Sequence, residues 1–465
     1  MKGTRENPTL PEMLGAYSAL ETARFHMPGH KGQTLLWPLD MAKWDITELT
    51  ETDNLYTPEG PILNTEKGWA EACGAKHSFL IVNGSTQCVI SMLLAVGQKK
   101  HILVCRDCHK SVSAGLAMAG HSVSFVYPDS EGTVDGVVSA RSVEAALKKC
   151  KADAVFITSP NFYGLCADIE AIAKVVHAHG ALLLVDSAHG AHLPFSPLLP
   201  RFPAECVDMW CISAHKTLSA LTQSAVLHLG VNCPLTEYDV RRTISLTQTT
   251  SPSYLIMASL DWALFSARHA DFEAHLKRLE KITERLQKLN GIRVFGKELV
   301  GKAGIYDVDV TRLVLDVSER GIDGRAAALA MEEMRVVPEM ADARRVVFIT
   351  GPADKDEWYE MLYEAVAALP YGKTDIKVTH PPELDRELAM PVRDAVLSRT
   401  ELVPIESCAG RIAAQAAGAY PPGIAAVFPG ERITNADIDY LFLQNKLKIP
   451  LFGAVKGKLC VVREG

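Results

Sequence analysis

Several features that would assign a chain to a special class are missing from this sequence. No apolar run approaches the roughly 20 residues of a membrane-spanning helix. The N-terminal stretch MKGTRENPTLPEML holds no apolar segment typical of a secretory signal. The net charge is -7, so the charge balance favours neither nucleic acid nor an anionic membrane as a partner. We therefore expect a cytoplasmic protein.

The 11 cysteines do not follow the spacing of a disulfide framework, which indicates reduced thiols. Internal repeats and low-complexity tracts are also missing. The 465 residues are 48% hydrophobic and 22% charged, an ordinary globular composition. A chain of this length has room for two or three domains with sizeable cores.

Short apolar runs alternate with helical segments in the first half of the chain. The predicted strands are Phe79–Val82, His101–Cys105, Val123–Tyr127, Ala154–Thr158, Ala181–Asp186, Val207–Ile212 and Ala225–Leu229. The predicted helices between them are Cys88–Val96, Ser142–Cys150 and Ile169–His179. Apolar strands without alternation, separated by helices, indicate an α/β fold with a mainly parallel sheet that helices cover on both faces.

The flanking parts of the chain differ in character. Residues 1–60 are rich in proline and glycine and read either as a surface tail or, given their apolar content, as an arm that packs on a partner or a site. A long amphipathic helix, Leu260–Leu289, leads into a smaller α/β domain, and Pro381–Glu383 marks a further boundary. The predicted units are an N-terminal arm (1–60), a large domain (61–260), a small domain (261–378) and a C-terminal domain (379–465).

Lys216 lies in the stretch Ser213–Thr217 (SAHKT), between two apolar runs. Burial lowers the pKa of a lysine amine and makes it available as a nucleophile, which can form a Schiff base with pyridoxal phosphate (PLP) or a carbonyl substrate. The alternative is a surface lysine at a strand end. Ligands of parallel sheets bind beyond the carboxyl ends of the strands. That rule selects Gly84–Thr86, Cys108–Ser111, Ser159–Gly164, Asp186–His189 and Ser213–Lys216.

Two hydroxyl-rich stretches could bind an anion. Gly84, Ser85 and Thr86 begin a helix, where free N–H groups and the helix dipole favour phosphate, although Ser and Thr are also ordinary N-caps. Thr247–Tyr254 (TQTTSPSY) is either the loop before a helix or a set of phosphate contacts, which could be made across a dimer interface.

Asp186 ends an apolar strand, where a carboxylate can keep a pyridine nitrogen protonated. A helix cap or a metal ligand is the alternative, since His189 and His192 follow, but no thiolate or second carboxylate joins them at metal-ligand spacing. Cys105–His109 matches the C-x-x-C-H pattern of haem attachment. That chemistry needs an exported chain, so we predict instead that His109 stacks on a flat cofactor.

Taken in order, these stretches resemble the ornithine/lysine/arginine decarboxylase family of PLP enzymes, with the aspartate-aminotransferase-like fold (fold type I), in its short form without a wing domain. The matching motifs run along nearly the whole chain: HMPGHKG (26–32), PEGPI (58–62), VNGST (82–86), CHKS (108–111), DSAHGAH (186–192), SAHKT (213–217), TSPSY (250–254), YPPGI (420–424) and PGE (429–431). The chain departs from the family pattern at Cys88, Ser187 and Ala214, which bears on the substrate more than on the cofactor.

The resemblance implies a role for each matching residue. Lys216 would carry PLP, Asp186 would pair with its ring nitrogen, and His109 would stack on its ring. The residues implied to contact the phosphate or flank the lysine are Gly84, Ser85, Thr86, Ser213 and His215. The remaining assignments are His189 beside the phenolic edge of the cofactor, Thr249 and Thr250 at the phosphate of a neighbouring subunit, and Tyr420 and Glu431 at the substrate site.

The implied function is PLP-dependent decarboxylation of lysine, ornithine or arginine to an amine, in a homodimer or larger homo-oligomer with shared sites. The sequence does not choose among the three amino acids. The alternatives are another PLP reaction on this fold, such as transamination or aldol cleavage, and a non-catalytic regulatory homologue. Lys216, Asp186 and His109 together argue against a protein that only binds.

Overall fold

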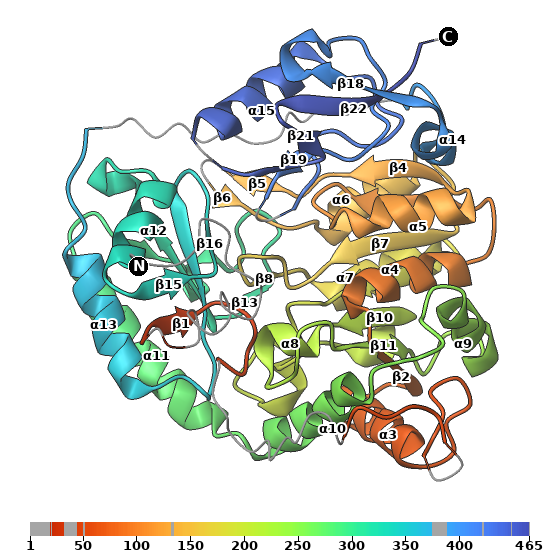
Figure 1. Ribbon diagram of the computed structural model, residues 1–465, viewed down its shortest axis with the longest axis horizontal. Coiled ribbons are helices and arrows are strands. Elements are labelled where there is room, and N and C mark those ends of the chain that lie inside the picture. Colours follow the sequence, from red (N-terminus) through yellow and green to blue (C-terminus); the bar gives the residue numbers. More distant parts are fainter. Residues whose placement is uncertain are drawn as a thin grey trace.

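The computed structural model describes residues 19, 21–31, 44–49, 52–131, 134–373, 388–420, 423–447 and 449–464. They form three lobes: a large lobe around the central sheet, a small lobe beside it, and a C-terminal lobe that lies against both (Figure 1). Some of the predicted features fall outside the described residues: Gly32, Pro421, Pro422, the boundary at Pro381–Glu383, and residues 1–18 and 33–43 of the arm.

The large lobe is built on a seven-stranded sheet. Its strands, in spatial order, are β2 (His77–Ile81), β11 (Ala225–Leu229), β10 (Met209–Ile212), β9 (Leu182–Asp186), β7 (Ala154–Thr158), β3 (His101–Cys105) and β4 (Ser122–Val126). β10, β9, β7, β3 and β4 are parallel, whereas β11 pairs antiparallel with both its neighbours. The prediction of a mainly parallel sheet is therefore confirmed.

Helices cover both faces of this sheet, as the apolar strands predicted. One face packs on α4 (Gly84–Ala95), α5 (Ser111–Ala119) and α9 (Glu237–Ser245). The other packs on α3 (Pro61–Cys73), α6 (Ala140–Leu147), α7 (Ile169–Ala178) and α10 (Tyr254–His269). Successive residues of β3 alternate between the two cores, with Ile102 and Val104 in one and Leu103 and Cys105 in the other.

The prediction of one helix over Leu260–Leu289 is wrong. The structure has two helices there, α10 and α11 (Phe272–Leu286). They are separated at Ala270 and Asp271, because the Asp271 carboxylate accepts the backbone N–H of Ala274 at 2.8 Å and so begins a new helix. The expectation that Gly84, Ser85 and Thr86 begin a helix is confirmed, since α4 begins at Gly84.

The small lobe contains a four-stranded sheet, in the order β12 (Arg293–Val294), β14 (Arg312–Asp316), β17 (Arg345–Ile349) and β16 (Met340–Ala341). Helices α12 (Gly324–Glu333) and α13 (Asp356–Ala367) pack on it. β1 (Ala23–Phe25) of the N-terminal arm pairs in parallel with β15 (Val336–Pro338). The Phe25 ring is fully buried against Phe348 of β17, so this part of the arm belongs to the core of the small lobe.

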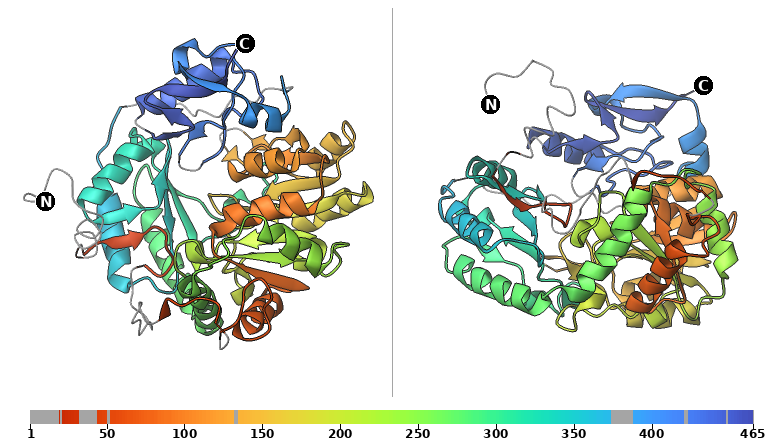
Figure 2. Two further views of the ribbon diagram at one scale, coloured as in Figure 1. Left: turned by 45° about the vertical axis from the view of Figure 1, so that its right-hand side comes forward. Right: turned by 60° about the horizontal axis from the view of Figure 1, so that its bottom comes forward.

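The C-terminal lobe has its own core around α15 (Asn435–Lys446) and a sheet of β18 (Thr400–Pro404), β22 (Lys458–Val462) and β21 (Ala454–Val455). Figure 2 shows this lobe from two further directions, stacked on the large lobe at the α14 (Val392–Leu397) side. Among the helices of the described ranges, none is long and apolar enough to cross a membrane.

Candidate active site

The loops after β3, β9 and β10 bring His109, Asp186 and Lys216 into one cluster. Each of these loops leaves the carboxyl end of a parallel strand, and such ends meet at the same edge of a sheet. The charges of Asp186 and Lys216 both act on the pKa of His109, and Asp186 acts on that of Lys216, so the three side chains lie within electrostatic range of one another. The sequence predicted this convergence.

Lys216 lies in α8 (Ala214–Thr217), a single turn that follows β10 directly. Its side chain is partly buried, and Nζ lies 3.1 Å from His189 Nε2. Burial lowers the pKa of Lys216, and the charge of Arg312 lowers it further, while Asp186 and Glu339 oppose the shift. The amine thus has the environment of a nucleophile rather than of a solvated surface lysine.

Asp186 is the last residue of β9 and is only 4% exposed. Its Oδ1 accepts the backbone N–H of Ala188 at 3.0 Å and lies 3.6 Å from the Cys211 thiol, which can donate to it. A buried carboxylate that accepts few hydrogen bonds within the protein can accept one from a protonated ligand nitrogen beside it, and so stabilise that proton.

His109 is half-buried after β3, and burial lowers its pKa to about 4, so the ring is neutral near neutral pH. Its Nδ1 accepts the backbone N–H of Ser111 at 3.3 Å. The C-terminal lobe reaches this ring, because Ile424 forms an isolated β-bridge with His109 and a Cβ added at Gly423 would lie 3.7 Å from His109 Cδ2.

The candidate phosphate contacts fit an anion. Gly84 opens α4 with φ +71°, and an added Cβ there would meet no described atom within 4 Å, so the space beside Gly84 is open. Ser85 is half-buried and Thr86 is exposed. The Ser213 hydroxyl is fully buried and makes no hydrogen bond within the described ranges. A buried hydroxyl without a partner is costly unless a ligand satisfies it. These residues therefore suit the phosphate of PLP.

His215 and the turn Ser159–Gly164 shape the surroundings. His215 Nδ1–H donates to the Ser224 carbonyl at 2.9 Å, and burial lowers the pKa of His215 to about 4. In the turn, the Phe162 ring lies edge-on to the His189 ring, with centroids 5.0 Å apart. That contact places the turn against a residue of the cluster, as its position after a strand end predicted.

Thr249 and Thr250 do not join the cluster in the described single chain. Both residues are exposed, at the loop between α9 and α10. The backbone of this loop is fixed by the Tyr56 hydroxyl, which donates to the carbonyls of Gln248 and Thr249 at 2.6 and 3.0 Å. Their side chains remain available to another copy of the chain.

The two predicted substrate residues occupy different environments. Glu431 is completely buried where the C-terminal lobe meets the large lobe, and its Oε2 lies 3.1 Å from Arg106 and accepts the Phe428 N–H at 2.7 Å. Tyr420 is 51% exposed, with Lys110 Nζ 5.9 Å from its ring. Tyr420 thus borders the His109 loop, whereas Glu431 joins two lobes.

Two residues of the small lobe that no sequence motif indicated also reach this cluster. Arg312 opens β14, is 1% exposed, and donates from NH2 to His189 Nδ1 at 2.9 Å. Glu339 follows β15 and accepts the Met27 N–H at 2.8 Å, within electrostatic range of Lys216. Arg312 could have been noticed as a charged residue that begins an apolar strand. Its position in the sequence does not indicate that His189 is its partner.

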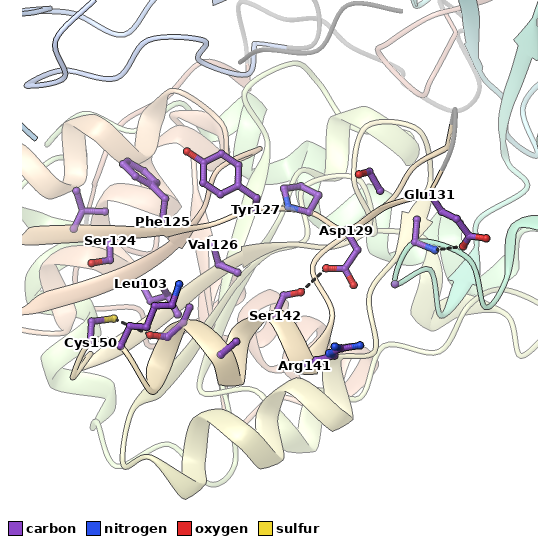
Figure 3. Close-up of a pocket in the computed structure, with 18 of the residues that line it drawn as sticks. Leu103, Ser124, Phe125, Val126, Tyr127, Asp129, Glu131, Arg141, Ser142 and Cys150 are labelled. Carbon is purple, nitrogen blue, oxygen red and sulfur yellow. Dashed lines mark hydrogen bonds between the residues drawn. The ribbon is translucent and has the colours of Figure 1, made fainter. Parts of the chain in front are cut away.

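A cavity of about 1140 Å³ lies elsewhere, along the edge strand β4 (Figure 3). Its lining includes Phe125, Tyr127, Glu131 and Arg141, and Asp129 accepts a hydrogen bond from Ser142 beside them. None of the predicted site residues lines this cavity. The strand-end cluster around Lys216 is therefore the better candidate for chemistry, because it holds the groups with shifted pKa values.

Comparison with known proteins bears on the identity of the chain. Residues 8–314 match the family model "Orn/Lys/Arg decarboxylase, major domain", and residues 376–453 match the C-terminal domain of the same family. An arginine decarboxylase of Bacillus subtilis (strain 168) is 29% identical over 97% of this chain and 96% of its own length. One from Halalkalibacterium halodurans is 30% identical over 94% of this chain and 93% of its own.

A comparison with solved structures shows the fold. The lysine decarboxylase LdcF of Francisella novicida superposes with a TM-score of 0.75 over 99% of this chain and 79% of its own, at 18% identity. The chain has the fold of type I PLP enzymes, as its motif order predicted. It belongs to the Orn/Lys/Arg decarboxylase family, in the short form of that family, and is a decarboxylase of a basic amino acid.

Proposed function

We propose that this enzyme decarboxylates arginine with PLP carried on Lys216. The observation that carries the assignment of Lys216 is its amine, partly buried at the carboxyl end of β10 and 3.1 Å from His189 Nε2. The relatives named above, both arginine decarboxylases, support arginine over lysine and ornithine. All 11 cysteines are free thiols, which supports a cytoplasmic enzyme.

Bound PLP supplies an electron sink for the carbanion that remains when carbon dioxide leaves the α-carbon of the substrate. The protein's own residues do the rest. Lys216 would hold the cofactor, and Asp186 would keep its ring nitrogen protonated. Ser85, Thr86 and Ser213 would hold its phosphate, and Lys216 or a neighbouring histidine would supply the proton for the α-carbon.

The cationic end of the substrate needs a carboxylate, and we assign that role to Glu339. Burial raises the pKa of Glu339, and the charges of Arg312, Lys31 and Lys216 oppose that rise. Its Oε2 is fixed by the Met27 N–H, and the residue remains partly exposed. Glu339→Gln should raise KM for arginine more than it lowers kcat, whereas Glu298→Gln, at an exposed site, should change neither.

The test of the cofactor assignment is chemical. The holoenzyme is reduced with borohydride and digested, and the pyridoxyl label should lie on Lys216. Lys31, also buried, serves as the internal control, and a label on another lysine would end the assignment. A panel of lysine, ornithine and arginine, with carbon dioxide and amine products measured, should give agmatine as the main product. A keto acid without carbon dioxide would instead indicate a transaminase.

A further inference from the structure

Three side chains from two lobes form a hydrogen-bonded series that ends at the reactive lysine. Arg312 NH2 lies 2.9 Å from His189 Nδ1, and His189 Nε2 lies 3.1 Å from Lys216 Nζ. Arg312 belongs to β14 of the small lobe, whereas His189 and Lys216 follow β9 and β10 of the large lobe. We refer to this arrangement as the Arg312 series.

The direction of each hydrogen bond follows from what the groups can donate. A guanidinium has only donors and stays protonated in proteins. His189 Nδ1 must therefore accept, so a neutral His189 carries its proton on Nε2. That Nε2–H points at Lys216 Nζ, and only an unprotonated amine can accept it. If Lys216 were protonated, its N–H groups would face the Nε2–H of His189, and two donors cannot form a hydrogen bond with each other.

We infer that Arg312 is a positioning residue: by fixing the Nε2–H tautomer of His189, it holds the Lys216 amine in its neutral, nucleophilic form. This inference rests on the proposal that Lys216 is the lysine that carries the cofactor. It assigns a task to a residue that lies in the small lobe and that need not touch the reacting atoms.

The surroundings of the series support this assignment. Arg312 is 1% exposed and His189 is 7% exposed, so water does not compete well for these bonds. The Nε and NH1 groups of Arg312 make no hydrogen bond to any described residue, which leaves His189 as the site to which the guanidinium is directed. The Phe162 ring, 5.0 Å from the His189 ring, limits its rotation.

The charges around the series act in opposite senses on Lys216. Burial and Arg312 lower its pKa, whereas Asp186, Glu339 and Cys211 raise it. The pKa of His189 lies well below its ordinary value because of burial and then because of Lys216, Arg312, His109 and His215. His189 therefore stays neutral near neutral pH, as the tautomer argument requires.

The series also couples the amine to the contact between the lobes. β13 (Asp307–Val308), just before Arg312, pairs antiparallel with β8 (Leu165–Cys166) of the large lobe. A Cβ added at Gly164 would lie 2.8 Å from Arg312 Cβ, so the two lobes are in close contact there. A shift of the small lobe at this point would move the guanidinium away from His189 Nδ1. His189 could then carry its proton on either ring nitrogen.

The test measures the reactivity of each lysine in the full-length apoprotein. Trace acetylation with acetic anhydride at a series of pH values, followed by peptide mass spectrometry, gives an apparent pKa for each lysine amine. The exposed Lys174 and Lys277 are internal references. In Arg312→Met, the midpoint for Lys216 should rise by about one pH unit or more. Arg312→Lys should stay near the wild-type midpoint, since a lysine is also a cation with donors only and can donate to His189 Nδ1.

Controls separate this effect from damage to the lobe contact and from failure of the cofactor assignment. Thr311→Val removes the hydrogen bond of Thr311 Oγ1 to His192 Nε2 (3.0 Å) at the same junction and should leave the Lys216 midpoint unchanged. An unchanged midpoint in Arg312→Met would overturn the inference, even where borohydride mapping confirms Lys216. Should Arg312→Met fail to fold, the 15N shifts of His189 in the wild-type apoprotein decide, and a proton on Nδ1 refutes the series.

Discussion

The backbone N–H of Gly29 donates to the carbonyl oxygen of His215 at 2.8 Å, although the two residues lie far apart in the sequence. The contact joins the N-terminal motif HMPGHKG to the turn that carries Lys216. It leaves no room for a side chain, because a Cβ added at Gly29 would lie 2.6 Å from the Leu218 carbonyl oxygen. Two of the motifs that identified the family are thus a single packing unit.

Gly29→Ala should therefore displace the turn of Lys216. Overpacking of this kind typically costs about 1–3 kcal/mol of stability, and here it should also weaken PLP binding, measured by equilibrium dialysis and visible absorbance. Gly351→Ala is the matched control, because an added Cβ there meets no described atom within 4 Å. Normal PLP affinity in Gly29→Ala would show that this contact does not position the lysine.

Asp186→Asn should leave the fold intact and bind PLP poorly, since the neutral amide cannot stabilise the charged ring nitrogen. Loss of a buried charge partner typically costs about 2–5 kcal/mol. The control is Asp208→Asn: Asp208 is equally buried at 4%, but it accepts the Leu183 N–H at the opposite end of the sheet. Asp208→Asn should lower stability without lowering PLP affinity, and near-normal turnover in Asp186→Asn would contradict the assignment.

The sequence predicted those parts of the site that follow strands. Lys216, Asp186 and His109 each come directly after a short apolar run, and the geometry of a parallel sheet then brings them together. Arg312 could not be paired with His189 in the same way, because their contact depends on how the small lobe packs on the large one. The break between α10 and α11 was missed because the amphipathic pattern continues through Asp271, although Asp is a common N-cap.

Glu431 illustrates the same limit. The resemblance implied a place at the substrate site, and the structure gives the carboxylate a buried partner in Arg106, whose guanidinium carbon also lies 5.0 Å from the centroid of the Phe125 ring. A contact between two lobes is set by tertiary packing, and no local pattern announces it. Whether Glu431 also serves the substrate stays a prediction, which mutation can decide.

Glu431→Ala should destabilise the enzyme by about 3–5 kcal/mol, because it leaves the buried Arg106 without its carboxylate. Glu401→Ala, which breaks the more exposed Glu401–Arg411 pair in the same lobe, should cost at most about 1 kcal/mol. Thermal and urea unfolding measure both. The double variant Arg106→Met with Glu431→Met should recover much of the stability. If activity returns as well, the role of Glu431 is to hold the C-terminal lobe against the large lobe. If a stable double variant stays inactive, the result supports a role of Glu431 at the substrate.

His228 should make stability depend on pH. It is completely buried in β11, its Nδ1 lies 2.7 Å from Ser78 Oγ, and burial lowers its pKa to about 3. Between its ordinary pKa of about 6.5 and that value, the unfolded chain binds a proton that the folded chain does not. The free energy of unfolding should therefore fall as pH drops through this window.

The measurement is urea unfolding at a series of pH values between those limits. His228→Phe in a Ser78→Ala background should reduce the slope of the pH dependence, because it removes one titrating ring and keeps an aromatic ring beside Trp210, whose centroid lies 4.9 Å away. Ser78→Ala alone should keep the slope of the wild type. Equal slopes in the single and double variants would exclude His228 as a source of the effect.

The exposed hydroxyls of Thr249 and Thr250 lead to the last prediction, that two copies of the chain share their active sites. A symmetric dimer presents the same surface on each subunit and so would complete both sites at once. Lys216→Ala and the double variant Thr249→Ala with Thr250→Ala should each be inactive alone. Mixed under conditions that exchange subunits, they form hybrids in which one site has both an intact lysine and intact hydroxyls, so some activity should return. Hybrids that form, as shown by mass spectrometry of the native complexes, and yet stay inactive would refute shared sites, as would an active monomer in sedimentation.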